Sequence, residues 1–228
     1  MMRLNSQNAA PVGGIDPSLR NDVLEQKLSR RSALPNAGEN VVLHCTQTDR
    51  FGLRGPGTMD WLAEQGLAAP GSVNEAVRLP CGTSVLRLGQ QEVLLTAPHG
   101  DSGERLRALR QAWHDSQLAA KGYDAYREEG WAWFVVTGPN AQDLMRRISM
   151  ADLRPTVLKV GQVTQTRALH MDVVIARLDH FGAPSYDIFF DIASSEFALE
   201  VLTETAEGLK ANFEVAALHA PGALHPHD

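Results

Sequence analysis

The sequence predicts an α+β protein with two tandem lobes, each with an antiparallel sheet covered by helices on one face. The first observation is a repeat: FGLRGPGTMDWL begins at Phe51, and FVVTGPNAQDLM begins eighty-three residues later, at Phe134. The second is that a hairpin pattern and another helix pattern follow each copy, so the order β-α-β-β-α occurs twice. The third is composition, because 228 residues that are 43% hydrophobic can bury a substantial core.

Each copy of the repeat begins as a strand and continues as a helix across a Gly-Pro pair. Gly55 and Gly138 are expected to form tight turns, and Pro56 and Pro139 then occupy the first helical position. The alternative for the first copy is a phosphate-binding loop, but GLRGPG lacks the Lys-Ser/Thr ending of such loops. We therefore interpret both copies as strand–turn–helix units.

The segments after each copy predict a hairpin and then a helix. Residues 84–97 predict a hairpin that turns near Gly89-Gln90, and residues 170–193 predict a longer one that turns near 182–184. Apolar side chains then recur at helical spacing in residues 103–118 and 194–209, and Ser194 or Ser195 could cap the second helix.

Composition sets the expected limits of the two lobes. Residues 1–30 read as a polar tail that ends in a short helix at 21–30, with Asn21 or Asp22 as its cap. The first lobe takes residues 31–120 and the second takes residues 121–217. Residues 218–228 form an irregular tail, whose histidines could bind a metal but are better interpreted as solvated: His219, His225 and His227.

Charge and composition exclude several classes of function. The formal net charge is −6 and no basic stripe occurs, so nucleic acid is not an expected partner. No apolar run approaches the roughly 20 residues of a membrane span, and the N-terminus lacks the apolar region of a secretory signal. Cys45 and Cys81 lack metal-ligand spacing and are interpreted as free thiols, while His44 and Cys45 would face opposite sides of a strand. We expect a cytoplasmic protein with no metal site.

The order of motifs in the second half resembles the glycine-cleavage T-protein family. The matching residues are Gly138–Ala141 before a helix, Asp152-Leu153, Asp172 in a hairpin, and Tyr186–Ile188. The phrases RRSALPNAG and GTSVLRLGQQEVLLTAP narrow the resemblance to the gamma subunit of heterotetrameric sarcosine oxidase. The resemblance covers residues 30–210 and implies a T-protein-like fold that lacks the family's C-terminal barrel.

The resemblance also implies a catalytic carboxylate. Enzymes of the T-protein family hold tetrahydrofolate in a central hole between lobes, and Asp172 falls at the position of the carboxylate that assists the reaction there. A partly desolvated Asp would stabilise a developing cation, and His170 would share its strand face. The alternative is that Asp172 pairs with Arg167 or Arg177, or faces a partner subunit.

Two further residues are candidates for folate contact, and three functions remain open. Tyr186 and Glu196 could touch the pterin ring, or serve strand packing and helix capping. The first function is a small non-flavin subunit of a multisubunit oxidative N-demethylase, which helps assembly and lines the folate or iminium channel. Tetrahydrofolate, flavins and NAD would then belong to the complex, with larger flavoprotein subunits as partners. The others are a short tetrahydrofolate-dependent aminomethyl or methyl transferase that uses Asp172, and a free-standing folate-binding regulator.

Overall fold

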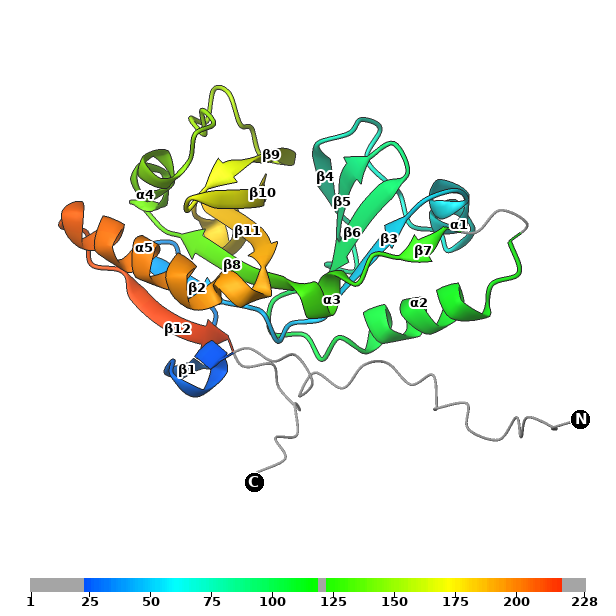
Figure 1. Ribbon diagram of the computed structural model, residues 1–228, viewed down its shortest axis with the longest axis horizontal. Helices are drawn as coiled ribbons and strands as arrows, with labels where there is room; N and C mark the ends of the chain where they lie inside the picture. The colour runs from blue at the N-terminus through cyan, green and yellow to red at the C-terminus, as the bar shows by residue number, and fades with distance from the viewer. Residues whose placement is uncertain (1–22, 119–121, 219–228) are drawn as a thin grey trace, which may run out of the picture.

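The computed structural model describes residues 23–118 and 122–218 (Figure 1). The expected caps at Asn21 and Asp22 and the three C-terminal histidines lie outside these residues. Of the short helix expected at 21–30, the structure shows a 3-10 turn, η2 (Val23–Gln26). No helix in the described part of the chain is long and apolar enough to cross a membrane.

The described residues form an α+β fold with one large, mostly antiparallel sheet. The helical elements after η2 are α1 (Thr58–Glu64), α2 (Glu104–Asp115), α3 (Arg127–Gly130), α4 (Ala141–Ile148), η3 (His180–Gly182), η4 (Ile192–Ser194) and α5 (Ser195–Gly208). The strands are β1 (Arg30–Arg31), β2 (Val41–His44), β3 (Arg50–Arg54), β4 (Glu75–Arg78), β5 (Ser84–Gly89), β6 (Glu92–Thr96), β7 (Tyr123–Asp124), β8 (Trp131–Thr137), β9 (Gln162–Ala168), β10 (Met171–Arg177), β11 (Ser185–Asp191) and β12 (Glu214–Leu218).

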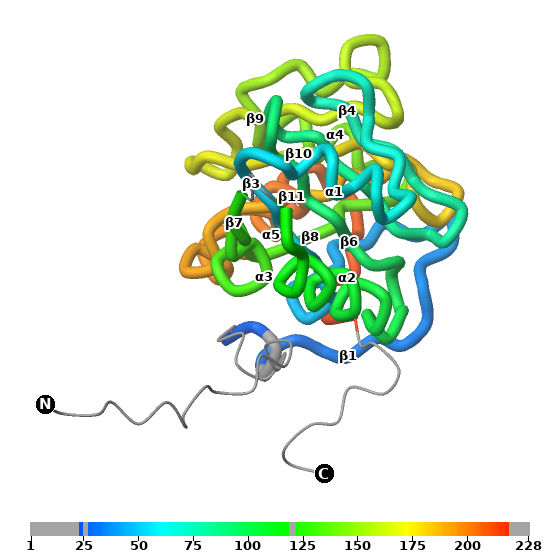
Figure 2. The backbone as a smooth tube through the Cα atoms, turned by 90° about the vertical axis from the view of Figure 1, so that its right-hand side faces the viewer, coloured from blue at the N-terminus to red at the C-terminus, as the bar shows by residue number. Residues whose placement is uncertain are grey.

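The sheet has two halves. The first half has the strand order β4-β5-β6-β3-β7, and the second has the order β1-β12-β2-β8-β11-β10-β9. Among the described residues, the strand pairing between the halves is the single pair Glu75–Gln162 of β4 and β9. Figures 1 and 2 both show these two strands meeting at one end of the molecule, with α2 and α3 towards the other.

The N-terminal strands lie in the second half, although the sequence predicts residues from 31 onwards in the first lobe. β2 pairs antiparallel with β8 and parallel with β12, and β12 pairs parallel with β1. The expectation of purely antiparallel sheets is therefore wrong at these two parallel pairings. Local patterns cannot reveal this placement, because the partners of β2 are roughly 90 and 170 residues away in the chain.

The two copies of the repeat have the same turn. Gly55 has φ 107° and Gly138 has φ 115°, which is backbone that side-chain-bearing residues rarely adopt. In each copy the N–H three residues later donates to the glycine carbonyl, from Thr58 at 3.3 Å and from Ala141 at 3.1 Å. Each proline is thus the second residue of a β-turn, where its fixed φ is favourable, and each helix begins two residues after it. The expectation of proline at the first helical position is wrong.

Both faces of the central strands are buried. Val173 and Ile175 of β10 pack with α4 and α5, whereas Val174 and Ala176 face the first half of the sheet. This two-sided burial explains why these strands read as continuous apolar runs. Between the halves lies a central cluster that takes residues from both: Val41, Leu43, Cys45, Leu86, Leu88, Leu94, Trp133, Val135, Val163, Val174, Ala176, Phe189 and Leu218.

Replacing Gly138 with Ala will destabilise the fold. A Cβ at this position would lie 2.1 Å from the carbonyl oxygen of Glu39 and 2.7 Å from the Cα of Asn40, so backbone must move in addition to the strain of the positive φ. We expect the free energy of unfolding, measured in urea, to fall by about 3 kcal/mol or more. The control is Gly71→Ala, whose new Cβ meets no atom within 4 Å and should change stability by less than about 0.5 kcal/mol. Equal effects in the two variants would mean that the close backbone approach at Gly138 does not limit stability.

Candidate functional site

Asp172 lies at the surface. It is the second residue of β10, its side chain is 95% exposed, and it pairs with Arg167 of β9 across 3.8 Å. Arg177, the other expected partner, instead pairs with Asp179 at 2.9 Å. The carboxylate of Asp172 is therefore not partly desolvated, as we expected for a catalytic residue. It forms the ion pair with Arg167 that was the alternative. The catalytic role of Asp172 stays a prediction.

His170 lies in a turn rather than on a strand. It follows β9 and precedes β10 in a two-residue hairpin turn, with φ 61° at His170 and 52° at Leu169. The prediction that His170 and Asp172 share a strand face is therefore wrong. The turn directs the His170 ring towards α5, where its centroid is 6.1 Å from that of Phe197. Glu196 lies in the first turn of α5, is half exposed and pairs with Lys27. A carboxylate there is favourable to the helix dipole, although the N-cap residue is Ser194.

Tyr186 is fully buried in β11, between strands and helices. Its hydroxyl donates to the carbonyl of Leu153 at 3.5 Å, and burial raises its pKa. The strand-packing interpretation therefore describes its position. The structure brings Asp172 and His170 together at one hairpin but leaves Tyr186 in a separate core.

The space between the two sheet halves is packed with side chains. The central cluster consists of Cys45 and of aliphatic and aromatic residues, all at most 6% exposed. From the resemblance to T-proteins, we expected a folate to lie in a hole between two lobes. The interior between the sheet halves is instead packed with side chains. Of the predicted site residues, those in the hairpin around Asp172 are accessible at the surface.

A buried polar cluster lies beside these apolar residues and was missed in the sequence. His99 follows β6, His180 lies in η3, and Asp187 lies in β11; all three are buried and their ligand-type atoms lie within 4.8 Å of one another. Asp187 Oδ2 is 2.8 Å from His180 Nε2, and Asp187 Oδ1 accepts from Trp133 Nε1 at 2.8 Å. His99 Nε2 is 3.9 Å from Asp187 Oδ1. The cluster thus joins a residue of the loop after the first half's β6 to two residues of the second half.

The electrostatics of this cluster follow from its burial. Desolvation, with repulsion from His180, lowers the pKa of His99 to about 3, so its ring is neutral near pH 7. Burial alone would raise the pKa of Asp187, but the charge and hydrogen bond of His180, together with His99 and the Trp133 N–H, lower it below its usual value. Asp187 is consequently a buried carboxylate. The signal in the sequence was an acid inside the apolar run YDIFF, the same kind of signal that drew attention to Asp172.

Arg50 connects the two places where the described chain passes between the sheet halves. It is 2% exposed and lies at the start of β3. Its guanidinium donates to five backbone carbonyls, in the segment before β3, in α3 and at the start of β8: Thr46, Thr48, Arg127, Glu128 and Trp131. All donor nitrogens of the guanidinium are used, which fixes both segments in one geometry.

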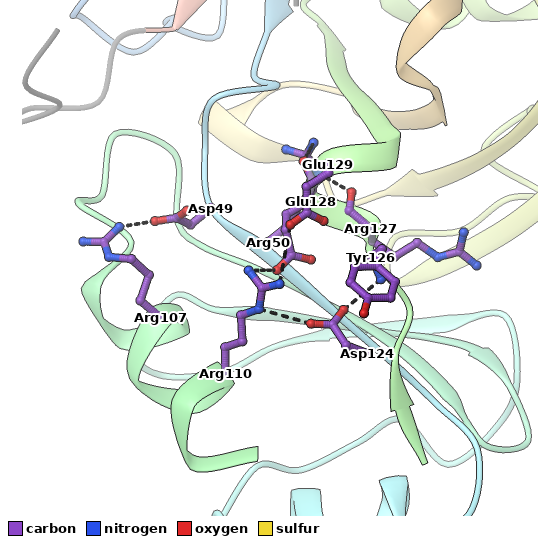
Figure 3. Close-up of polar contacts among 9 residues, drawn as sticks. All are labelled: Asp49, Arg50, Arg107, Arg110, Asp124, Tyr126, Arg127, Glu128 and Glu129. Atoms are coloured by element: carbon purple, nitrogen blue, oxygen red, sulfur yellow. Dashed lines mark hydrogen bonds and ion pairs between the residues drawn. The ribbon is translucent and has the colours of Figure 1, made fainter. Parts of the chain in front are cut away.

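A second arginine lies next to Arg50 and gathers three carboxylates (Figure 3). Arg110 of α2 reaches Glu128 at 2.7 Å, Asp124 at 3.1 Å and Glu129 at 3.4 Å. Burial and the neighbouring charge of Asp124 raise the pKa of Glu128 to about 7, although Arg110 opposes this shift. The arrangement anchors α2 against α3, and Figure 3 shows the carboxylates converging on the arginine.

Comparisons with known proteins support the fold. No protein-family model matches the chain, and no curated protein matches its sequence. One chain of the heterotetrameric sarcosine oxidase from Corynebacterium sp. U-96, in complex with pyrrole 2-carboxylate, is 25% identical with a TM-score of 0.62. That similarity covers 78% of this chain and 89% of the other.

A second solved structure is the glycine cleavage system aminomethyltransferase T from Bartonella henselae. It is 13% identical with a TM-score of 0.55, and the similarity covers 78% of this chain. It covers 48% of the aminomethyltransferase, so this chain spans about half of that protein's length. The first similarity supports the T-protein-like superfamily that the sequence resembles, and the second supports the fold.

Replacing Glu128 with Gln will reduce the pH dependence of stability. The pKa of Glu128 is about 7 in the folded chain, whereas its ordinary value is 4.5. Between pH 4.5 and pH 7, the folded state therefore keeps a proton on Glu128 that the unfolded state loses. The free energy of unfolding of the wild type should therefore fall as pH rises from 4.5 to 7, by up to about 3 kcal/mol from this group. The variant should lose this part of the slope in urea unfolding at pH 5 and pH 8.

The control is Glu129→Gln, which removes a more exposed carboxylate that also pairs with Arg110. This control should keep most of the wild-type slope, because desolvation and Asp124 raise the pKa of Glu128 more than Glu129 does. A Glu128→Gln variant with an unchanged slope would mean that Glu128 is ionised throughout this range.

Proposed function

We propose that this chain is a small non-flavin subunit of a multisubunit oxidative N-demethylase, with a role like that of a sarcosine oxidase gamma subunit. The observation that carries the proposal is the extent of similarity. It spans 89% of one chain of a heterotetrameric sarcosine oxidase but only 48% of an aminomethyltransferase. The chain thus corresponds in extent to one chain of an assembled oxidase.

The candidate site supports an assembly role rather than independent catalysis. Asp172 is solvated and ion-paired, a setting that gives a carboxylate little of the electrostatic effect of a water-excluded site. The interior between the sheet halves is filled by the central cluster. The proposed complex is cytoplasmic and contains larger flavoprotein subunits, and tetrahydrofolate, flavins and NAD belong to the complex. This chain helps to line the channel for the iminium or folate.

Exposed apolar side chains support a protein partner. Met150 is 82% exposed, Val160 is 55% exposed, Val157 is 51% exposed and Phe197 is 46% exposed. The first three lie in the segment between α4 and β9, and Phe197 lies on α5 beside His170. A partner subunit that covers these side chains would remove apolar surface from water. The contact of Asp172 with that partner is part of the same proposal.

The proposal predicts that the native chain is isolated with a flavoprotein and does not bind folate by itself. Affinity purification from cells that produce the protein should give a complex with the visible absorbance of flavin. Isothermal titration of the isolated chain with tetrahydrofolate should give no binding heat. A chain that runs alone in native lysate, without flavin, would overturn the subunit proposal.

The transferase alternative makes the opposite prediction for titration. Tetrahydrofolate would then bind the isolated chain, and Asp172→Asn would weaken the binding. The matched control is Asp143→Asn, which removes another exposed carboxylate from an arginine pair, that with Arg146 at 3.7 Å. Binding that is lost only in Asp172→Asn would favour the short transferase, and binding that survives both substitutions without turnover would favour a folate-binding regulator.

A further inference from the structure

Two buried ring nitrogens in the cluster between the sheet halves have no hydrogen-bond partner among the described residues. They are Nε2 of His99 and Nδ1 of His180, and the side chains that carry them are 2% and 4% exposed. A buried polar atom without a partner is uncommon and costly in a folded protein. The 3.9 Å between His99 Nε2 and Asp187 Oδ1 is too long for a hydrogen bond. The lone pair of His99 Nε2 is therefore available to an ion at this position.

We propose that His99, His180 and Asp187 bind one divalent transition-metal ion, with zinc as the best fit, as a structural link between the sheet halves. Two imidazole nitrogens and one carboxylate oxygen are three donors that zinc accepts, and a water molecule would complete its four ligands. Bonds of about 2.0–2.2 Å place neighbouring ligand atoms about 3.3 Å apart around a tetrahedral ion. The separations of 3.9 Å and 2.8 Å in this cluster lie on either side of that value. The ion takes the place of the proton between His180 Nε2 and Asp187 Oδ2.

The surroundings of His99 and Asp187 have the pattern of a metal site's outer contacts. Ligand histidines usually hold their second nitrogen in a hydrogen bond, which fixes the ring and leaves the first nitrogen free for the metal. Cys45 Sγ lies 3.8 Å from His99 Nδ1, which is the nitrogen on the other side of the ring from Asp187. Trp133 Nε1 likewise holds Asp187 Oδ1 at 2.8 Å.

The burial of the cluster favours a structural metal over catalysis. Cys45, His99 and Asp187 follow one another in the order of a nucleophile, a base and its orienting acid. Cys45 is fully buried, however, so no substrate reaches its sulfur. Two histidines and one carboxylate also hold catalytic iron, but those sites keep open positions for substrate. Here Trp133 and Phe181 pack against the His99 ring, with centroids at 5.0 Å and 5.3 Å. A metal enclosed in this way enters as the chain folds.

Metal titration of the full chain tests the proposal. To exclude the C-terminal histidines, the parent protein carries Gln at His219, His225 and His227. After a chelator has removed bound metal, titration with Zn²⁺ should show one equivalent bound per chain and a rise in Tm of at least about 5 °C. Co²⁺ should give the intense visible bands of a four-coordinate ion. Less than a tenth of an equivalent of Zn²⁺, with no Co²⁺ bands, would overturn the proposal.

Variants of the ligands locate the ion. His99→Gln and Asp187→Asn should each weaken Zn²⁺ binding at least 100-fold, whereas His170→Gln, which removes an exposed histidine outside the cluster, should bind as the parent does. Unchanged binding in His99→Gln would place the ion elsewhere and contradict the proposal. If a ligand variant does not fold, the Co²⁺ spectrum of the parent still decides, because its absence rules out the site.

Discussion

The two sheet halves depend on one buried cation that holds two crossing segments of chain together. Arg50 gives all its donors to carbonyls of residues 46–48 and 127–131, which carry the chain from the second half to the first and back. Hydrogen bonds from a charged donor contribute about 1.5–3 kcal/mol each, and five carbonyls would lose their partner together without it. Gly52 belongs to the same constraint, because an added Cβ would lie 2.3 Å from Cγ of Arg127. The crossing is therefore defined by side-chain-to-backbone contacts rather than by strand pairing.

This constraint explains the character of the interface between the halves. With one strand pair joining β4 to β9, most of the adhesion must come from burial of apolar side chains in the central cluster. Polar groups at this interface include the cluster in which Asp187 contacts His180 and Trp133. Because the interior between the halves is packed in this way, contacts with other molecules would fall on the surface. This view is consistent with exposed apolar residues at 150–160 and on α5.

The sequence predicted the locally encoded part of the fold and failed where distant segments meet. The Gly-Pro turns, the hairpin of β5 and β6, the pairing of β10 with β11 and the helices α2 and α5 follow from glycine geometry and short-range periodicity. The parallel pairing of β12 with β1 and β2 could not be seen, since no local pattern specifies a partner so far along the chain. The candidate site shows the same limit. Asp172 and Asp187 look alike as acids in apolar strands, but Asp172 lies at the end of a hairpin and Asp187 lies between the sheet halves. Only the tertiary arrangement distinguishes the solvated acid from the buried one.

The position of β2 has a consequence for how a cell makes this protein. The described strands and helices of the first half lie between residues 50 and 124, so this half can form as soon as that stretch leaves the ribosome. The second half needs Val41–His44, which is synthesised early, yet its neighbours are β8 and β12, and β12 is the last strand of the described chain. The apolar edge of β2 must therefore stay unpaired through most of translation, at roughly 5–20 residues per second. This segment must therefore be kept from associating prematurely while the chain is synthesised. Chaperones that bind short apolar stretches can protect it.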